Sequence, residues 1–117
     1  MKLESALILE DEAIVAFALE EMLMDLGCER ICVATTLAEA FRCIEDQIPE
    51  LAVLDVNIRG DRSYGVAEAL AAKGVPFIFA TGYGDAEHPP AFSSVPTLTK
   101  PYSPEQLSAA LELCRSR

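Results

Sequence analysis

The sequence predicts a single α/β domain built on a parallel sheet. Short apolar runs rich in Val, Ile and Leu alternate with amphipathic segments of helical length, and this alternation is typical of a parallel sheet covered by helices on both faces. The chain has 117 residues, of which 51% are hydrophobic, so it can form the core of one domain of ordinary size. Five strands are expected, at Ala6–Leu9, Arg30–Ala34, Leu51–Leu54, Val75–Ala80 and Thr97–Leu98.

The first helix is expected from Glu12 to Leu26, and Gly27 can close it because glycine readily adopts the left-handed conformation that ends a helix. Apolar residues at helical spacing predict the face that packs on the sheet, with the acidic side chains directed to water. This predicted buried face consists of Ile14, Val15, Ala18, Leu19, Met22 and Leu26.

Capping signals predict where two further helices begin. Thr36 and Glu39 have the spacing of a capping box, in which each side chain bonds to a free backbone N–H of the first turn. Ser103 and Gln106 have the same spacing, with Pro104 in the first turn, where proline is tolerated. The two helices are therefore expected after the second and the fifth strand.

The stretch between the third and fifth strands predicts one regular helix and one irregular segment. A helix is expected over Tyr64–Lys73, ending at Gly74. The segment Asp85–Pro96 stands where a fourth helix belongs, but it contains three prolines, and a proline inside a helix removes a hydrogen bond. This helix is therefore expected to be short or mobile.

Charge and hydropathy narrow the class of partner. The formal charge is −10, from 19 acidic and 9 basic side chains, and a surface of this sign repels phosphate backbones, so direct binding to nucleic acid is not expected. No secretory signal is evident, and no apolar run approaches the roughly 20 residues that a membrane helix needs. We expect a cytoplasmic protein with no membrane segment.

Because no linker or repeat is visible, one domain is expected over residues 1–117, without an output domain.

The four cysteines are predicted to be buried thiols. Cys28, Cys32, Cys43 and Cys114 have neither paired Cys-x-x-Cys spacing nor a nearby histidine cluster, and a free cysteine usually behaves as a small core residue. The only histidine, His88, is expected in a loop beside two prolines, which argues against a metal site built on histidine.

Polar side chains stand at or just after the ends of four predicted strands, and they form the candidate site. These residues are Glu10 and Asp11, Asp55, Thr81 and Lys100. The carboxyl ends of parallel strands share one edge of the sheet, and ligands of open α/β sheets bind in the crevice at that edge. We therefore expect three carboxylates, one hydroxyl and one ammonium group to meet there.

This combination of groups predicts a Mg²⁺ site that assists phosphoryl transfer. Clustered carboxylates repel one another unless a cation lies between them, and Mg²⁺ commonly takes one or two carboxylates with further oxygen ligands. The expected ligands are Glu10, Asp11 and Asp55, together with the backbone carbonyl of Asn57. Asp55, at the end of the central-looking third strand, is the expected nucleophile.

The remaining polar groups are suited to hold a phosphoryl group once it has been transferred. Lys100 can pair with a phosphoryl oxygen as a point charge, and the Thr81 hydroxyl can donate a hydrogen bond to it. Gly82, directly after Thr81, leaves room for the group beside the backbone. Taken singly, an acidic pair at a helix start is often only a cap, and a threonine after a strand is usually a turn residue.

With these residues in place, the sequence resembles the receiver domains of two-component response regulators over essentially its whole length. Leu7–Glu12 is similar to the acidic metal-binding pair of the family, Leu54-Asp55 to its phospho-acceptor, Ala80–Gly82 to its switch hydroxyl and Thr99–Tyr102 to its lysine motif. The resemblance implies a flavodoxin-like (βα)₅ fold with strand order 2-1-3-4-5 and a cis peptide bond before Pro101.

The resemblance also implies a function. Asp55 would accept a phosphoryl group from a sensor histidine kinase or a phosphotransfer protein and would lose it by slow autodephosphorylation, so the chain would be a regulator rather than an enzyme. Its output would be contact with a downstream protein target or removal of phosphate from the pathway.

The motif Phe79–Tyr83 further resembles the mostly single-domain receivers nicknamed FATGUY. These proteins lack the switch aromatic three residues before the lysine, and Thr97 occupies that position here. The usual switch, in which an aromatic ring follows the threonine, is then unavailable. The hypothesis is that Tyr83 and the segment Asp85–Pro96 act with Thr81 as the switch instead.

Two other functions are compatible with parts of the sequence. A pseudo-receiver would keep the fold and bind a partner without being phosphorylated, although every motif residue is present. A phosphatase of the aspartyl-phosphate kind is suggested by Asp55-Val56-Asn57, but such enzymes need a second acid where Asn57 stands, and an amide cannot act as a general acid or base.

Overall fold

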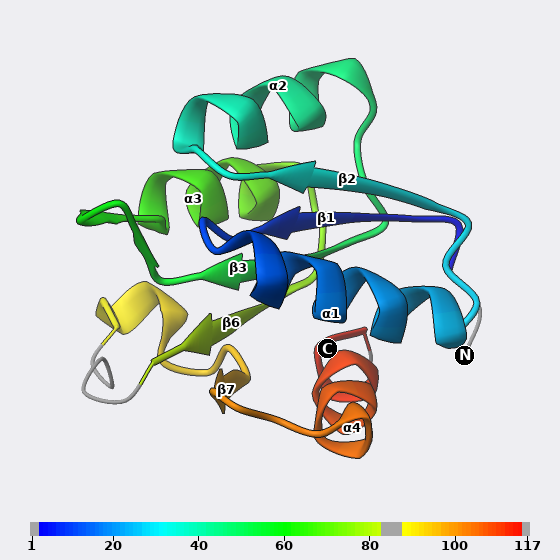
Figure 1. Ribbon diagram of the computed structural model, residues 1–117. Coiled ribbons are helices and arrows are strands. Elements are labelled where there is room, and N and C mark those ends of the chain that lie inside the picture. The colour runs from blue at the N-terminus through cyan, green and yellow to red at the C-terminus, as the bar shows by residue number, and fades with distance from the viewer. Residues whose placement is uncertain (1–2, 83–87, 116–117) are drawn as a thin grey trace.

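The computed structural model describes residues 3–82 and 88–115, and it has the predicted α/β architecture (Figure 1). Five parallel strands form one sheet in the order β2-β1-β3-β6-β7, which is the expected order 2-1-3-4-5. Each boundary lies within two residues of the predicted one. The strands are β1 (Ser5–Leu9), β2 (Arg30–Ala34), β3 (Leu51–Asp55), β6 (Phe77–Thr81) and β7 (Thr97–Thr99).

The register of the strands brings their carboxyl ends to one edge of the sheet. Leu9, the last residue of β1, pairs with Leu54 in β3, and Leu54 pairs with Phe79 in β6. Thr81, at the end of β6, pairs with Thr99 in β7. The polar residues that end or follow these strands therefore lie next to one another at this edge of the sheet.

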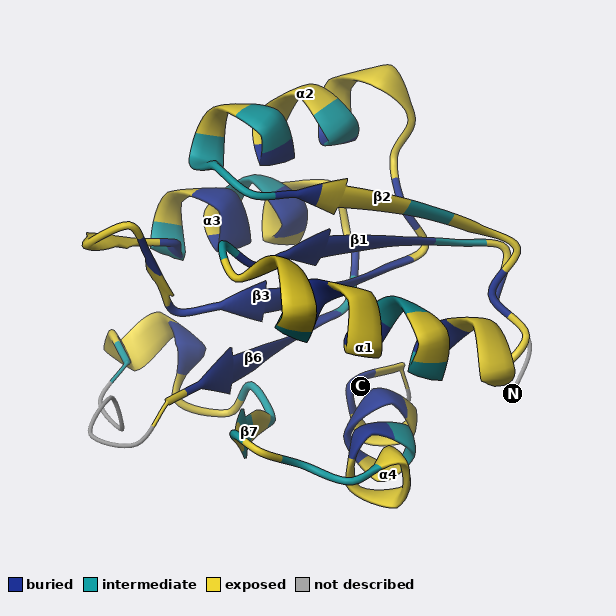
Figure 2. Ribbon diagram, in the orientation of Figure 1, coloured by how far each residue is buried: buried dark blue, intermediate teal, exposed yellow. Residues whose placement is uncertain are grey.

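Helices cover both faces of the sheet, and side chains that alternate along each strand divide the core into two layers. Leu7, Leu9 and Leu54 pack in one layer with α2 (Leu37–Asp46) and α3 (Tyr64–Ala72). Ile8, Val53 and Ile78 pack in the other layer with α1 (Ala13–Asp25) and α4 (Pro104–Arg115). Figure 2 shows the central strands buried along most of their length, whereas the outer faces of the helices are exposed.

Both predicted helix starts are capped, at α2 and α4, but at α2 the carboxylate of Glu39 bonds to Thr35 instead of to the cap residue Thr36. The Glu39 N–H donates to Thr36 Oγ1 at 3.1 Å, while the Glu39 carboxylate accepts from the N–H of Thr35 at 2.7 Å. In α4 the bonds are reciprocal, because the Gln106 N–H donates to Ser103 Oγ and the Ser103 N–H donates to Gln106 Oε1. Helix starts were therefore well predicted.

The predicted buried face of α1 was partly wrong. Leu19 is buried as expected, but Ile14 is 86% exposed and Ala18 is also exposed. The residues that pack on the sheet are Ala16, Leu19 and Leu23. Apolar residues lie nearly all round this helix, so its periodicity does not single out one face.

A small β-hairpin follows β3 and was not predicted. It pairs β4 (Asn57–Ile58) with β5 (Asp61–Arg62) through a two-residue turn. Both turn residues have positive φ, 51° at Arg59 and 91° at Gly60, which is the conformation of a type I′ hairpin turn. The only sequence signal was the glycine in the second turn position.

The segment before β7 agrees with the expectation of a short helix over the residues that are described. It contains one three-residue 3₁₀ helix, η1 (Pro90–Phe92), whose Phe92 is buried. The part of the predicted segment before His88, together with Tyr83, lies outside the described residues.

Two of the cysteine predictions were wrong. Cys28 and Cys114 are buried free thiols as expected, but Cys32 and Cys43 form a disulfide between β2 and α2. Cys32 lies on the edge strand of the sheet and is exposed. The two cysteines are 11 residues apart, and only the packing of α2 on β2 brings them together.

Within residues 3–82 and 88–115, no helix combines the length and the apolar character needed to cross a membrane.

The layered core predicts that two leucines of α4 contribute very differently to stability. Leu111 is fully buried, whereas Leu113 is 58% exposed. Replacing Leu111 by alanine should lower the free energy of unfolding by about 3 kcal/mol because it leaves a cavity in the core. Leu113→Ala, the matched control, should change it by less than about 0.5 kcal/mol. Urea denaturation measures both, and equal losses would contradict this description of α4.

Candidate functional site

Three acidic side chains meet at the carboxyl edge of the sheet. Glu10 and Asp11 follow β1, and Asp55 ends β3. Each of them offers a carboxylate oxygen, and these oxygens all lie within 4.8 Å of one another. Glu10 and Asp55 are buried and Asp11 is half-buried. The proximity expected from the strand ends is therefore present in the structure.

Lys100 neutralises part of this acidic cluster. Its Nζ donates to Glu10 Oε1 at 2.5 Å and to Asp55 Oδ2 at 2.9 Å. The backbone holds the lysine in place, because the Lys100 N–H donates to the carbonyl of Thr81 at 2.8 Å. The peptide bond between Lys100 and Pro101 is cis, as the family resemblance implied.

Burial and hydrogen bonding act in opposite directions on these groups. Burial raises the pKa of Glu10, and the hydrogen bonds from Lys100 and from the Glu12 N–H offset this only in part. Burial alone would lower the pKa of Lys100, but its hydrogen bonds to Glu10 and Asp55 outweigh burial and hold the pKa above its ordinary value. Lys100 is therefore a firmly charged group between two carboxylates.

An open hollow of about 340 Å³ lies beside the cluster. It is lined by Asp11, Glu12, Asp55, Asn57, Arg59, Gly60, Gly82 and Lys100. A Cβ atom added to Gly82 would meet no heavy atom within 4 Å, so the backbone here faces open space. The hollow therefore offers room for a small anionic group next to Asp55 and Lys100.

The β4–β5 hairpin forms one wall of the hollow and holds two of the acids. The Arg59 N–H donates to Asp11 Oδ2 at 3.0 Å, and the Asn57 N–H donates to Asp55 Oδ1 at 3.3 Å. The side chain of Asn57 closes the turn by accepting from the Gly60 N–H at 2.9 Å. Sequence reasoning included Asn57 but missed Arg59, because the bond comes from its backbone and not from its side chain.

Thr81 lies at the same edge but is not part of the lining of the hollow. It is buried, and its hydroxyl donates to the carbonyl of Gly82 at 2.9 Å. Thr97, at the switch position where other receivers carry an aromatic residue, is exposed on β7 and donates to the carbonyl of Val95. Tyr83, which was also expected to take part in the switch, lies outside the described residues.

His88 has a position that the sequence did not reveal. Its Nδ1 is 2.9 Å from the Tyr64 hydroxyl on α3, and its Nε2 is 2.9 Å from the Thr97 hydroxyl on β7. The imidazole also packs on Phe79, with ring centroids 4.5 Å apart. His88 thus links α3 to β7 beside the end of β6, whereas its sequence neighbours indicated only a loop.

The donor set of the acidic cluster fits a small divalent cation. Carboxylate and backbone carbonyl oxygens are hard ligands, and Glu10, Asp11 and Asp55 supply three carboxylates whose oxygens lie within 4.8 Å of one another. No cysteine or histidine belongs to this cluster, so the ligands suit Mg²⁺ better than zinc.

The parallel sheet of order 2-1-3-4-5, with acidic groups and a lysine at its carboxyl edge, defines a receiver protein with a flavodoxin-like fold. The chain belongs to the response regulator receiver domain family, whose model matches residues 6–112.

Relatives and solved structures agree with this assignment. The solution structure of SdrG from Sphingomonas melonis Fr1 is 39% identical, with a TM-score of 0.84 and 97% of each chain covered. The phyllosphere-induced regulator PhyR of Methylorubrum extorquens is 36% identical over 90% of this chain and 41% of its own length. The transcriptional regulatory protein PdtaR of Mycobacterium tuberculosis is 31% identical over 95% of this chain and 56% of its own. The chain thus spans about half the length of these curated relatives.

The position of His88 predicts a pH dependence of stability. Burial lowers the pKa of His88 in the folded protein, so the folded state binds a proton less readily than the unfolded state. The contribution of His88 to the free energy of unfolding is therefore present above its pKa in the unfolded state, about 6.5. It is lost as the pH falls through its pKa in the folded state. Between pH 7.5 and pH 5.5, the urea midpoint of unfolding should fall more for the wild type than for His88→Gln, whose side chain does not titrate. Equal falls in the two proteins would show that His88 does not contribute.

Proposed function

We propose that this receiver accepts a phosphoryl group on Asp55 with the help of Mg²⁺ and signals through contacts with other proteins. The observation that carries the proposal is the contact of Lys100 with both Glu10 and Asp55 in a cluster of three carboxylates. A structural salt bridge needs only one acid for each base. The additional acids make chemical sense if a cation also binds between them.

The residues divide the work of the transfer. One oxygen of Asp55 attacks the phosphorus of a phosphohistidine, the bond from phosphorus to the imidazole nitrogen breaks, and the imidazole leaves with the electron pair. The N–H of Asn57 orients Asp55. Lys100, released from the carboxylates, pairs with a phosphoryl oxygen. Glu10, Asp11, Asp55 and the carbonyl of Asn57 would hold Mg²⁺, which would neutralise charge on the transferring group.

Thr81 has the role of the switch residue in this proposal. To donate to a phosphoryl oxygen, its hydroxyl must leave the carbonyl of Gly82. We assign the chain to the FATGUY subgroup from Phe79–Tyr83 and from Thr97 at the aromatic position. His88 already contacts Thr97, so a rearrangement of Tyr83 and the segment Asp85–Pro96 would act on the link between β7 and α3.

In this proposal one protein donates the phosphoryl group to the chain, and another binds the phosphorylated form. The donor is a sensor histidine kinase or a phosphotransfer protein, and it must reach the hollow over the start of α1. Ile14 and Phe17 present exposed apolar side chains there, 86% and 63% accessible, and such side chains are common in protein interfaces. The phosphorylated form would be bound by a downstream target protein at the surface formed by β6 and β7. The alternative is that the chain serves mainly to remove phosphate from the pathway. Loss of the group would occur by slow autodephosphorylation.

Intact mass spectrometry tests the proposal directly. Incubation with Mg²⁺ and acetyl phosphate should add the mass of one phosphoryl group to the wild type. Asp55→Asn should gain nothing, because an amide cannot attack in place of the carboxylate. Asp61→Asn on the exposed β5 is the matched control and should be phosphorylated like the wild type. Addition of EDTA should abolish the reaction.

A wild type that binds Mg²⁺ but gains no mass from acetyl phosphate or from any autophosphorylated kinase of a purified panel would refute phosphorylation. The chain would then be a pseudo-receiver that binds its partner without this chemistry.

The lysine contact predicts competition between Lys100 and the metal. Lys100→Met removes a positive charge a few ångströms from the carboxylates, and a charge pair at that distance is worth about 1 kcal/mol or more. The affinity for Mg²⁺ at pH 7.5 should therefore rise at least about fivefold, while phosphorylation falls. Calorimetric titration measures the affinity, and Lys73→Met on the exposed end of α3 is the charge-matched control. Unchanged or weaker Mg²⁺ binding by Lys100→Met would contradict the proposed site.

A further inference from the structure

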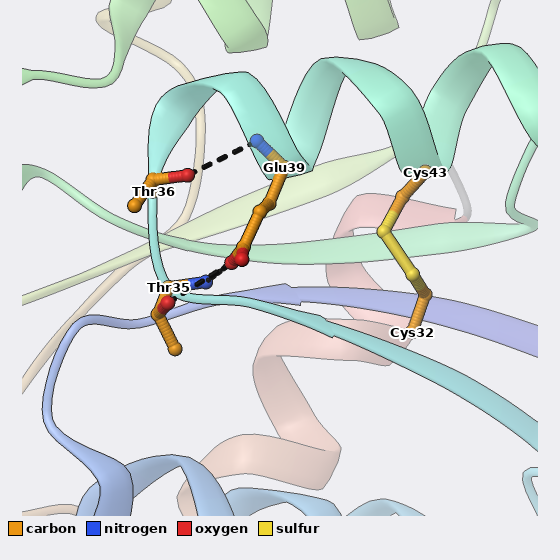
Figure 3. The surroundings of a disulfide bond; sticks show 5 residues. All are labelled: Cys32, Thr35, Thr36, Glu39 and Cys43. Atoms are coloured by element: carbon orange, nitrogen blue, oxygen red, sulfur yellow. Dashed lines mark hydrogen bonds between the residues drawn. A yellow bond between two sulfur atoms is a disulfide. The ribbon is translucent and has the colours of Figure 1, made fainter.

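The disulfide between Cys32 and Cys43 joins the edge strand β2 to helix α2 (Figure 3). The Cα atoms are 6.4 Å apart, within the usual range for a disulfide. The bond closes a short loop of the chain, since the two cysteines are separated by 11 residues. None of the groups of the acidic site takes part in it.

The bond is accessible to small molecules in solution. Cys32 is exposed and Cys43 is half-buried, and both line an open hollow of about 270 Å³ together with Arg30, Asp46 and Gln47. Exchange between thiols and disulfides requires that a thiolate reach a sulfur atom of the bond. The location of Cys32 on the outermost strand gives such access.

The other two cysteines differ sharply in their surroundings. Cys28 and Cys114 are buried in the core layer between the sheet and helices α1 and α4, with exposed fractions of 5% and 4%. Burial raises the pKa of the Cys28 thiol, which lowers its reactivity. The fold therefore separates one accessible pair from two inert thiols.

Few fully buried side chains hold α2 on the sheet, although β2 is paired with β1 along all five of its residues. In α2 only Ala40 and Ile44 are buried, and in β2 only Ala34 is buried. The start of α2 is held by hydrogen bonds at Thr35 and Thr36, but its second half lacks such bonds to β2 among those described. The disulfide acts on that half, so its loss should loosen α2 from the sheet.

We propose that Cys32 and Cys43 form a reversible redox site that exchanges with a low-molecular-weight thiol of the glutathione kind, and that the oxidised state clamps α2 onto β2. In reduction, the thiolate of the small thiol attacks the sulfur of Cys32, the bond to Cys43 breaks, and Cys43 leaves as a thiolate and takes up a proton. A second small thiolate attacks the mixed disulfide and releases Cys32. Two small thiols thus give two electrons and two protons and become one small disulfide, and oxidation is the reverse.

A glutathione titration of the folded protein tests the exchange. The full chain is equilibrated in buffers of increasing ratio of reduced to oxidised glutathione, quenched with acid, alkylated after denaturation and analysed by intact and peptide mass. The expected result is one transition of two thiols, confined to Cys32 and Cys43. Cys43→Ser should instead carry glutathione on Cys32. Cys114→Ala should titrate like the wild type, because that thiol is buried.

Two outcomes would overturn the redox site. A bond that resists every native buffer and is reduced only in denaturant is a static structural link. Thiols that stay alkylatable in fully oxidised buffer never form the bond.

The clamp has its own measurement. Reduction should lower the melting temperature by about 10 °C, the loss expected when a short loop is no longer closed. Amide exchange should accelerate more in α2 and β2 than in α4, because the clamp acts on α2 and β2 directly. Identical exchange in α2 in both redox states would refute the clamp. Asp55→Asn should show the same glutathione transition and the same difference between its two redox states as the wild type, so the failure of phosphorylation would leave this inference intact.

Discussion

The candidate site depends on one interaction, the contact of the Lys100 ammonium with the carboxylates of Glu10 and Asp55. These residues follow or end three different strands, so the contact exists only if the strands run parallel and in register. It also compensates a charge that would otherwise oppose folding, because burying two unpaired carboxylates is costly. In the proposed function, a cation bound between the acids would take over this neutralisation and release the lysine.

The position of the site could be predicted from the sequence because its residues interrupt a simple pattern. Asp55 ends an apolar strand, and ligands of open α/β sheets bind at such strand ends. Lys100 and the acidic pair could be placed in the same way. The motifs indicated the family, and the resemblance to the family implied the cis peptide bond before Pro101. Local sequence sufficed wherever the relevant unit was a strand end or a helix cap.

The predictions that failed required knowledge of tertiary packing. The face that α1 buries depends on how the helix docks, and its apolar residues, among them the exposed Phe17, allow several rotations. Whether Cys32 meets Cys43 depends on the packing of α2 against β2, since both cysteines lie in segments whose own patterns indicate a core. The contacts of His88 with Tyr64 and Thr97 span 24 and 9 residues and leave no periodic signal. Sequence motifs and hydrophobic periodicity do not reveal contacts of this kind.

The division of the core into two layers has a consequence for how such a chain can vary. Among the described residues, the layer beneath α2 and α3 and the layer beneath α1 and α4 share no buried side chain, and the sheet lies between them. A change in side-chain volume on one face can be absorbed without repacking the other. One face can therefore adapt to a new binding partner while the opposite face conserves the geometry of the strand ends. The sheet serves as a partition between two surfaces that can diversify independently around one unchanged chemical centre.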